Sequence, residues 1–163
     1  KAIEIDPQFE ADRIAKDLPV HILGLQNATE SHNATEWYII GPALEMKGKH
    51  AEAIEAYDEA IRMDPEFAQA WSDKGNALVE LNRSEEAIEA YNKSLEIDPQ
   101  DAMTWYHKGL ALASQGEYDE SIKAFDKALE IDPQLESARE VKSIVVQARA
   151  LDFTSLKVAY VTV

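Results

Sequence analysis

The chain has 163 residues, a formal net charge of −15 at pH 7 and no cysteine. Such an acidic chain repels phosphate backbones, so we expect no nucleic-acid partner. Without cysteine, disulfides and thiolate metal sites are excluded. No apolar run approaches the ~20 residues that cross a membrane, so we expect no membrane partner. The excess of acidic side chains either keeps the protein soluble or attracts a basic partner.

Residues 1–33 are expected to hold the end of an upstream repeat and an irregular helical segment. The opening KAIEIDPQ (1–8) nearly repeats KALEIDPQ (127–134). The later copy ends a predicted helix, because Pro133 cannot continue it. We therefore expect the chain to begin inside a repeat of a longer protein, with its true N-terminus missing. We expect a cytoplasmic location, and the missing N-terminus leaves export open.

After this segment the sequence repeats with a period of 34 residues, which predicts repeats at 34–67, 68–101 and 102–135. The spacing from Asn33 to Glu36 is typical of a helix start. The recurring positions are Trp37, Trp71 and Trp105; Gly41, Gly75 and Gly109; Leu44, Leu78 and Leu112; Ala53, Ala87 and Ser121; Tyr57, Tyr91 and Phe125; and Pro65, Pro99 and Pro133.

Each repeat is predicted to be a helix, a short turn and a second helix. In residues 68–81 the apolar side chains recur at helical spacing. Asn82 follows, where the other repeats have glycine and where a helix exit needs a left-handed residue. The second helix covers residues 84–97, and Asp98-Pro99 ends it because proline lacks the amide hydrogen that would continue the ladder.

The recurring glycines stand inside the first helices, where glycine costs about 1 kcal/mol relative to alanine. Close approach of the second helix would compensate for this cost. We expect each glycine to face the small residue of that helix, for example Gly109 to face Ser121. We expect the rings of Tyr57, Tyr91 and Phe125 to fill the wider gaps between neighbouring repeats.

The last part of the chain departs from the period. Residues 136–151 keep the spacing of a first helix, with Arg139 in the tryptophan position, and predict a capping helix that is polar outside. Residues 152–163 are expected to be a non-repeat tail with a weak strand-like alternation. Because residues 20–25 and 156–163 are apolar and lie outside the repeats, we expect one of these segments to cover a stack end or a groove, its own or that of a second copy; the alternative is a tail that is merely solvated.

The repeat resembles a known family. W-x-x-x-G-x-x-L, then A-x-x-x-[YF], then a terminal proline on a 34-residue period is similar to the tetratricopeptide repeat over residues 34–135. The resemblance implies an all-α fold, a right-handed superhelical solenoid of stacked antiparallel helix pairs. It also implies a concave groove, lined by the first helices, that binds a protein or peptide ligand.

In this sequence, the positions that would line the groove of the family carry mostly uncharged side chains. Asn76 matches the family's groove asparagine, whose side chain bonds the backbone of a ligand. A basic clamp for terminal carboxylates, known in one branch, is absent, since Lys74 and Lys108 lie on the other side beside the glycines. The candidate peptide-binding residues are Tyr38, Gln69, Ser72, Asn76, Val79, Met103, Tyr106 and Leu110, with Pro42, Glu45 and Ala113 at neighbouring groove places.

No motif for catalysis or cofactor binding stands beside the repeats. The four histidines share no metal-ligand spacing, and the glycines belong to the repeat rather than to a phosphate loop. We therefore expect no enzyme, no cofactor and no metal. The favoured function is a protein-interaction scaffold. Two alternatives stay open: a self-assembling module, with a homo-oligomer formed through the tail or the stack ends, and a recruiting domain of a larger enzyme.

Overall fold

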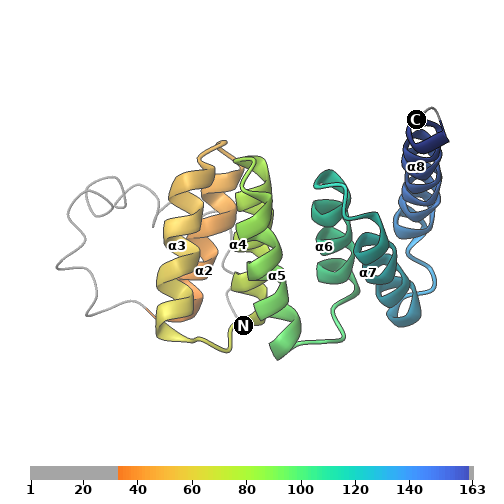
Figure 1. Cartoon of the computed structure of the whole chain (residues 1–163). Helices are drawn as coiled ribbons and strands as arrows, with labels where there is room; N and C mark the ends of the chain where they lie inside the picture. The colour runs from red at the N-terminus through yellow and green to blue at the C-terminus, as the bar shows by residue number, and fades with distance from the viewer. Residues whose placement is uncertain (1–32, 162–163) are drawn as a thin grey trace. The chain divides into compact units, whose positions relative to one another are not determined.

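The computed structural model describes residues 33–161, with side chains for residues 33–151. Every regular element in that range is an α-helix (Figure 1). The expectations for residues 1–32, the end of an upstream repeat and an irregular helical segment, fall outside the described residues, as does the very end of the chain.

Short turns join successive helices within each unit of the fold. The helices are α2 (Ala34–Glu45), α3 (His50–Met63), α4 (Ala68–Glu80), α5 (Ser84–Ile97), α6 (Ala102–Ser114), α7 (Tyr118–Ile131) and α8 (Glu136–Val161). Two compact units divide them, the first ending at Arg83 and the second beginning at Ser84. In the first unit α3 packs against both α2 and α4. In the second, α6 packs against α5 and α7, and α7 against α8. Within the units, the contacts of α2 with α3 and of α6 with α7 are the most extensive.

The helix ends follow from local chemistry. Asn33 caps α2: its Oδ1 accepts from the backbone N–H of Glu36 at 3.0 Å, which confirms the predicted helix start. Asp101 caps α6 in the same way, through the amides of Met103 and Thr104. Asn82 has φ 58°, the left-handed conformation that its place in the repeat predicts, and it lets the chain leave α4 in a tight turn.

The recurring glycines make room for aromatic rings, which corrects the sequence-based expectation. A Cβ on Gly109 would lie 2.7 Å from Cε1 of Phe125, on the paired helix of the same repeat. Gly41 faces the ring of Tyr57 in the same manner. The small residue is also close, since Ser121 Oγ donates to the Gly109 carbonyl at 2.7 Å. The rings of Tyr57 and Phe125 therefore lie over the glycine of their own helix pair rather than only between repeats.

The tryptophans of α4 and α6 connect each of these helices to the proline that precedes it. Trp71 Nε1 donates to the Pro65 carbonyl at 3.1 Å, and Trp105 Nε1 donates to the Pro99 carbonyl at 3.0 Å. In α8 the equivalent position is Arg139, whose Nη2 donates to Pro133 at 2.6 Å. The guanidinium thus replaces the indole as donor at the start of the last helix.

Helix α8 is longer than the sequence indicates. It runs from Glu136 to Val161, so the strand-like alternation expected over residues 156–160 is wrong. No glycine or proline interrupts residues 136–161, and each added residue of an existing helix gains a hydrogen bond without a new nucleation cost. The inner face of α8 packs on α7, where Ala138 and Val145 lie against Phe125.

Candidate functional site

The candidate groove residues come from α2 and α4 in the first unit and from α6 in the second. Each unit is described by itself. In the first unit the side chains converge on one carboxylate that is not among the candidate residues. That carboxylate belongs to Asp73, in the middle of α4.

Asp73 joins the two first helices of its unit. The hydroxyl of Tyr38, on α2, donates to Asp73 Oδ2 at 2.8 Å. From the same helix as Asp73, Gln69 Nε2 donates to Oδ1 at 3.1 Å and Asn76 Nδ2 donates to Oδ1 at 3.4 Å. Three of the predicted groove residues therefore meet at one aspartate. The helical spacing 69, 73, 76 places all three α4 residues on one face, and this signal was available in the sequence.

A second carboxylate reinforces the negative charge of this surface. Burial, followed by the charge of Asp73, raises the pKa of the Glu45 carboxyl, while His50 and the Tyr57 hydroxyl oppose the rise. Burial and the hydrogen bond to Asp73 likewise raise the pKa of the Tyr38 phenol, so it stays a neutral donor. The surface around Asp73 is therefore acidic, whereas the sequence predicted mostly neutral candidate residues.

The remaining candidates of the first unit differ in accessibility. Ser72 is only 3% exposed, so its side chain does not reach the surface. Val79 is exposed near the end of α4. Around Tyr38 the neighbours are aromatic, with the rings of Phe67 and Tyr57 at centroid distances of 4.8 and 6.1 Å. Tyr57 is buried, so Tyr38 and Phe67, which are both partly exposed, form the aromatic flank of the acidic centre.

In the second unit the predicted residues on α6 are partly used by the core. Tyr106 packs on Phe125, with 5.9 Å between ring centroids, and Leu110 is half-buried against the same cluster. Met103 is 46% exposed near the start of α6. This surface is apolar, and it differs in character from the acidic surface around Asp73.

Metal binding has no support in the part of the chain that the structure describes. No group of three or more histidine, aspartate or glutamate side chains there could hold a metal ion. Among the same residues, no helix combines the length and apolarity that would let it span a bilayer.

Sequence comparison identifies the repeat. Two tetratricopeptide repeat profiles match the chain, one over residues 40–102 and the other over residues 102–135. Together these matches cover more than half of the sequence. No curated protein matches it.

Solved structures agree on the fold. The crystal structure of MamA has a TM-score of 0.75 at 22% identity, covering 95% of this chain and 91% of its own. The first TPR of Spaghetti (RPAP3), bound to the HSP90 peptide SRMEEVD, has a TM-score of 0.71 at 21% identity, covering 74% and 96%. A TPR2B-domain:pHsp70 complex of yeast Sti1 has a TM-score of 0.69 at 27% identity, covering 71% and 98%. The fold class is therefore an all-α helical-repeat solenoid.

Proposed function

Because this chain belongs to the tetratricopeptide repeat family, we propose that it is a non-catalytic scaffold that binds a peptide segment of a partner protein along its first helices. The relatives of known structure include complexes with an HSP90 peptide and with pHsp70. The surface around Asp73 supports the same mode of binding here, with a different preference for charge.

The observation that carries this preference is the carboxylate pair of the first unit. Asp73 is partly buried and accepts hydrogen bonds from Tyr38 and Gln69, and Glu45 lies close enough for the charge of Asp73 to raise the pKa of its carboxyl. Two neighbouring carboxylates favour a cation between them, because a positive charge relieves their mutual repulsion. The partner segment is therefore one that presents a lysine or arginine beside an apolar residue, which would pack on the aromatic flank.

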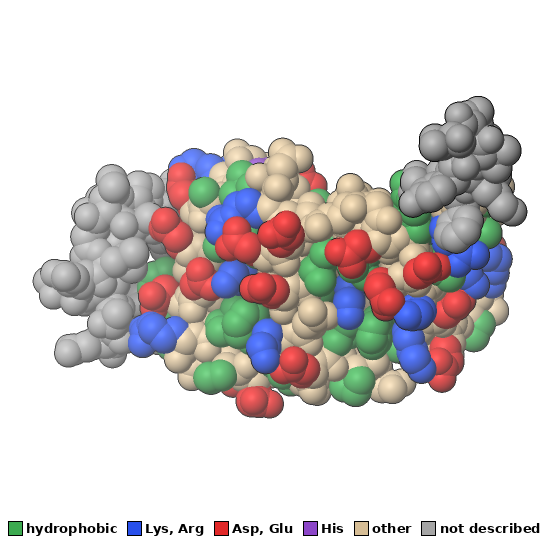
Figure 2. Space-filling model, in the orientation of Figure 1, with side chains coloured by type: hydrophobic (Ala, Val, Ile, Leu, Met, Phe, Trp, Pro, Cys, Tyr) green, Lys and Arg blue, Asp and Glu red, His purple; other side chains and the backbone are tan. Residues whose placement is uncertain are grey.

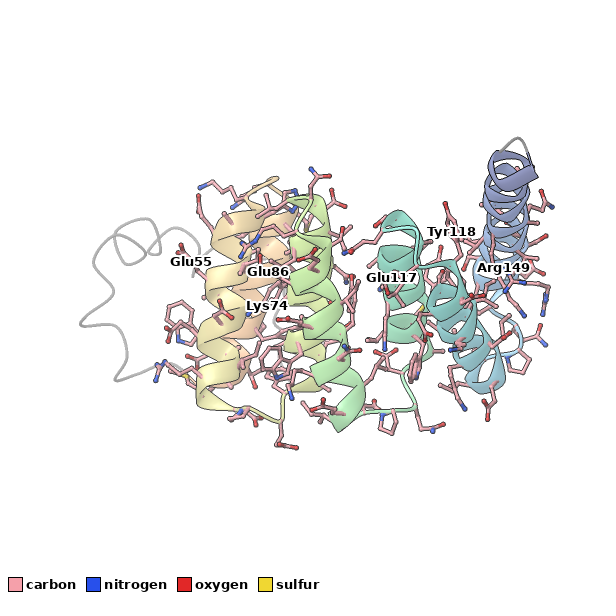
Figure 3. The ribbon with its side chains drawn as sticks, viewed as in Figure 1. Glu55, Lys74, Glu86, Glu117, Tyr118 and Arg149 are labelled. Atoms are coloured by element: carbon pink, nitrogen blue, oxygen red, sulfur yellow. The ribbon has the colours of Figure 1, made fainter. Side chains whose placement is uncertain are left out.

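Selection from a random peptide library on the intact chain tests this proposal. The enriched peptides are expected to be basic. Asp73→Asn is expected to weaken their binding by about tenfold or more, since hydrogen bonds to charged groups contribute about 1.5–3 kcal/mol. Glu55→Gln is the matched control, because Glu55 is an exposed acid on α3 of the same unit (Figure 3). Acidic peptides, or equal effects of the two variants, would refute the proposal.

The pH dependence of binding gives a second readout. A bound cation favours the ionised form of Glu45, so binding releases a proton from the fraction that is still protonated. The affinity for a basic peptide is expected to rise as the pH increases through the raised pKa of Glu45. Glu45→Gln removes this titration and should flatten that part of the pH profile. An unchanged profile would exclude Glu45 from the binding surface.

A second candidate function, self-assembly, rests on the outer side of α8. Ile144 is 64% exposed and Leu151 is 68% exposed, and seven residues apart they share one face of the helix. Exposed apolar patches of this kind favour association. Light scattering across a concentration series tests it: an oligomer that Ile144→Glu dissociates supports self-assembly, and a monomer at all concentrations rejects it.

A further inference from the structure

The second unit contains a hollow of about 410 Å³ between α5, α6 and α7. Its wall includes Ile88 and Asn92 from α5, Trp105 and Lys108 from α6, and Lys123 and Lys127 from α7. It is separate from the candidate groove residues, none of which lines it. The chain as a whole is strongly acidic, and Figure 2 shows acids and bases intermixed on the visible face. Of the three lysines around the hollow, Lys123 pairs with Glu120 and Lys127 with Glu130, which leaves Lys108 as the lysine that differs.

The repeat pattern explains why one of these lysines differs from its counterparts. In the first unit Lys74 Nζ pairs with Asp58 Oδ1, sixteen residues earlier, at 2.6 Å (Figure 3 labels Lys74). Two periods later Lys142 pairs with Asp126 in the same way. These pairs connect a first helix to the second helix of the preceding repeat.

Lys108 occupies the same repeat position between them, but its expected partner is changed. Sixteen residues earlier stands Asn92, an amide in place of the carboxylate. Within residues 33–151 Lys108 forms no ion pair, and its ammonium lies over the Trp105 ring, 5.0 Å from the centroid. Burial lowers the pKa of Lys108, and the charge of Glu120 only partly opposes this effect. A half-buried ammonium without a carboxylate is costly, and an added anion would offset that cost.

The acid in the hollow is already engaged. Glu120 Oε1 pairs with Lys123 at 2.7 Å. The Glu120 carboxylate also favours a ligand with a single negative charge, because it would repel a dianion more strongly than a monoanion. Among the described residues of the wall there is no arginine, whose paired N–H groups would bind a phosphate with two hydrogen bonds. Trp105 and Ile88 supply an apolar surface next to the ammonium.

We propose that this hollow binds a single carboxylate attached to an aromatic or branched apolar group. Lys108 supplies the charge, Asn92 a neutral hydrogen-bond donor, and Trp105 with Ile88 the surface for the apolar part. Such a group occurs in a small carboxylic acid and at the free C-terminus of a peptide that ends in an apolar residue. This site does not depend on the proposed groove function and would add a second, oppositely charged contact to the same chain.

Titration of the full chain, followed by ¹⁵N–¹H NMR, tests the proposal with defined probes. The probes are 3-phenylpropionate, acetyl-Gly-Gly-Phe with a free carboxylate, the amides of both, and phenyl phosphate. The two acids are expected to shift signals of α5, α6 and α7, including the Trp105 indole. The acid that binds more tightly shows whether the natural ligand is a small carboxylic acid or the C-terminus of a peptide. Absence of binding by both acids, equal binding by the amides, or tighter binding of phenyl phosphate would overturn the proposal.

Two substitutions locate the site. Lys108→Gln is expected to weaken binding of the acids about tenfold or more. Asn92→Asp restores the carboxylate of the repeat pattern, which should pair with Lys108 as Asp58 pairs with Lys74 and so compete with the ligand without unfolding the chain. Lys74→Gln is the matched control and should leave the affinity unchanged. If Asn92→Asp is folded and binds the acids as tightly as the natural sequence does, the hollow is not the site.

Discussion

Replacing Gly109 by alanine tests whether a glycine inside α6 exists to admit the ring of Phe125. The added Cβ would lie 2.7 Å from Cε1 and 2.9 Å from Cδ1 and Cζ of that ring. Ordinary carbon–carbon contacts are about 3.5–4.0 Å, so the ring or the helix must move by roughly 0.8 Å or more. Phe125 is 0% exposed and packs against Ala128, Ala138 and Val145, so the ring has no open space into which to move.

The expected magnitude combines two opposing effects. Overpacking of a filled core costs about 1–3 kcal/mol. Alanine in place of glycine favours the helix by about 1 kcal/mol. Gly109→Ala is therefore expected to destabilise the second unit by about 0–2 kcal/mol, which is too wide a range to decide the question by itself.

A double-mutant cycle separates the two effects. Phe125→Leu removes the ring, and in that background Gly109→Ala should become neutral or stabilising because only the helix preference is left. The coupling between the two sites is expected to be about 1–3 kcal/mol. Native-state hydrogen exchange of α6 and α7 measures it, since repeat proteins need not unfold in one step. Additive effects within about 0.5 kcal/mol would refute the reasoning.

Three further predictions concern single residues. Pro42 lies inside α2, where it removes a backbone donor, so Pro42→Ala is expected to raise the melting temperature of the first unit; a lower one would show that a neighbour depends on the proline. Arg139→Leu removes the donor to Pro133 and should cost about 1 kcal/mol, whereas Arg139→Trp should retain the bond; equal losses in the two variants would contradict this reading of the pair. The folded-state pKa of Glu45 lies above its unfolded value, so the unfolded chain ionises first and stability falls as the pH rises from the ordinary glutamate range. Denaturant titrations from pH 4 to pH 8 should show a smaller decline for Glu45→Gln, and parallel curves would exclude this origin.

The helical part of the fold could be predicted from the sequence because its determinants are local and repeated. The left-handed turn at Asn82 and the helix start at Asn33 each depend on a few adjacent residues. The strand-like prediction for the tail was wrong because it also rested on a local signal. Three apolar residues in alternation are too short a signal to outweigh a helix that already exists, and α8 continues through them.

The candidate site was less predictable because its character depends on contacts between helices. Counting helical turns from the tryptophans predicted that Tyr38, Gln69 and Asn76 share one surface, and in the structure all three donate hydrogen bonds to Asp73. The count could not show that Asp73 is their common acceptor, nor that Ser72, one residue before it, is buried. Both facts depend on how α2 lies against α4, and the repeat period does not specify this.

The bonds from Trp71 to Pro65 and from Arg139 to Pro133 have a mechanical consequence. Each spans only six residues, and within each unit a helix packs mainly on its neighbours along the chain. Among the described residues of each unit, the extensive helix contacts reach no further than the next repeat, as the bond from Tyr38 to Asp73 over 35 residues does, so a pulling force at the ends loads one repeat after another. Helix pairs should therefore peel away one after another at low force, each 34-residue length releasing roughly 110–120 Å of extended chain. Such a chain would act as a soft, stepwise extensible tether between whatever is attached to its ends.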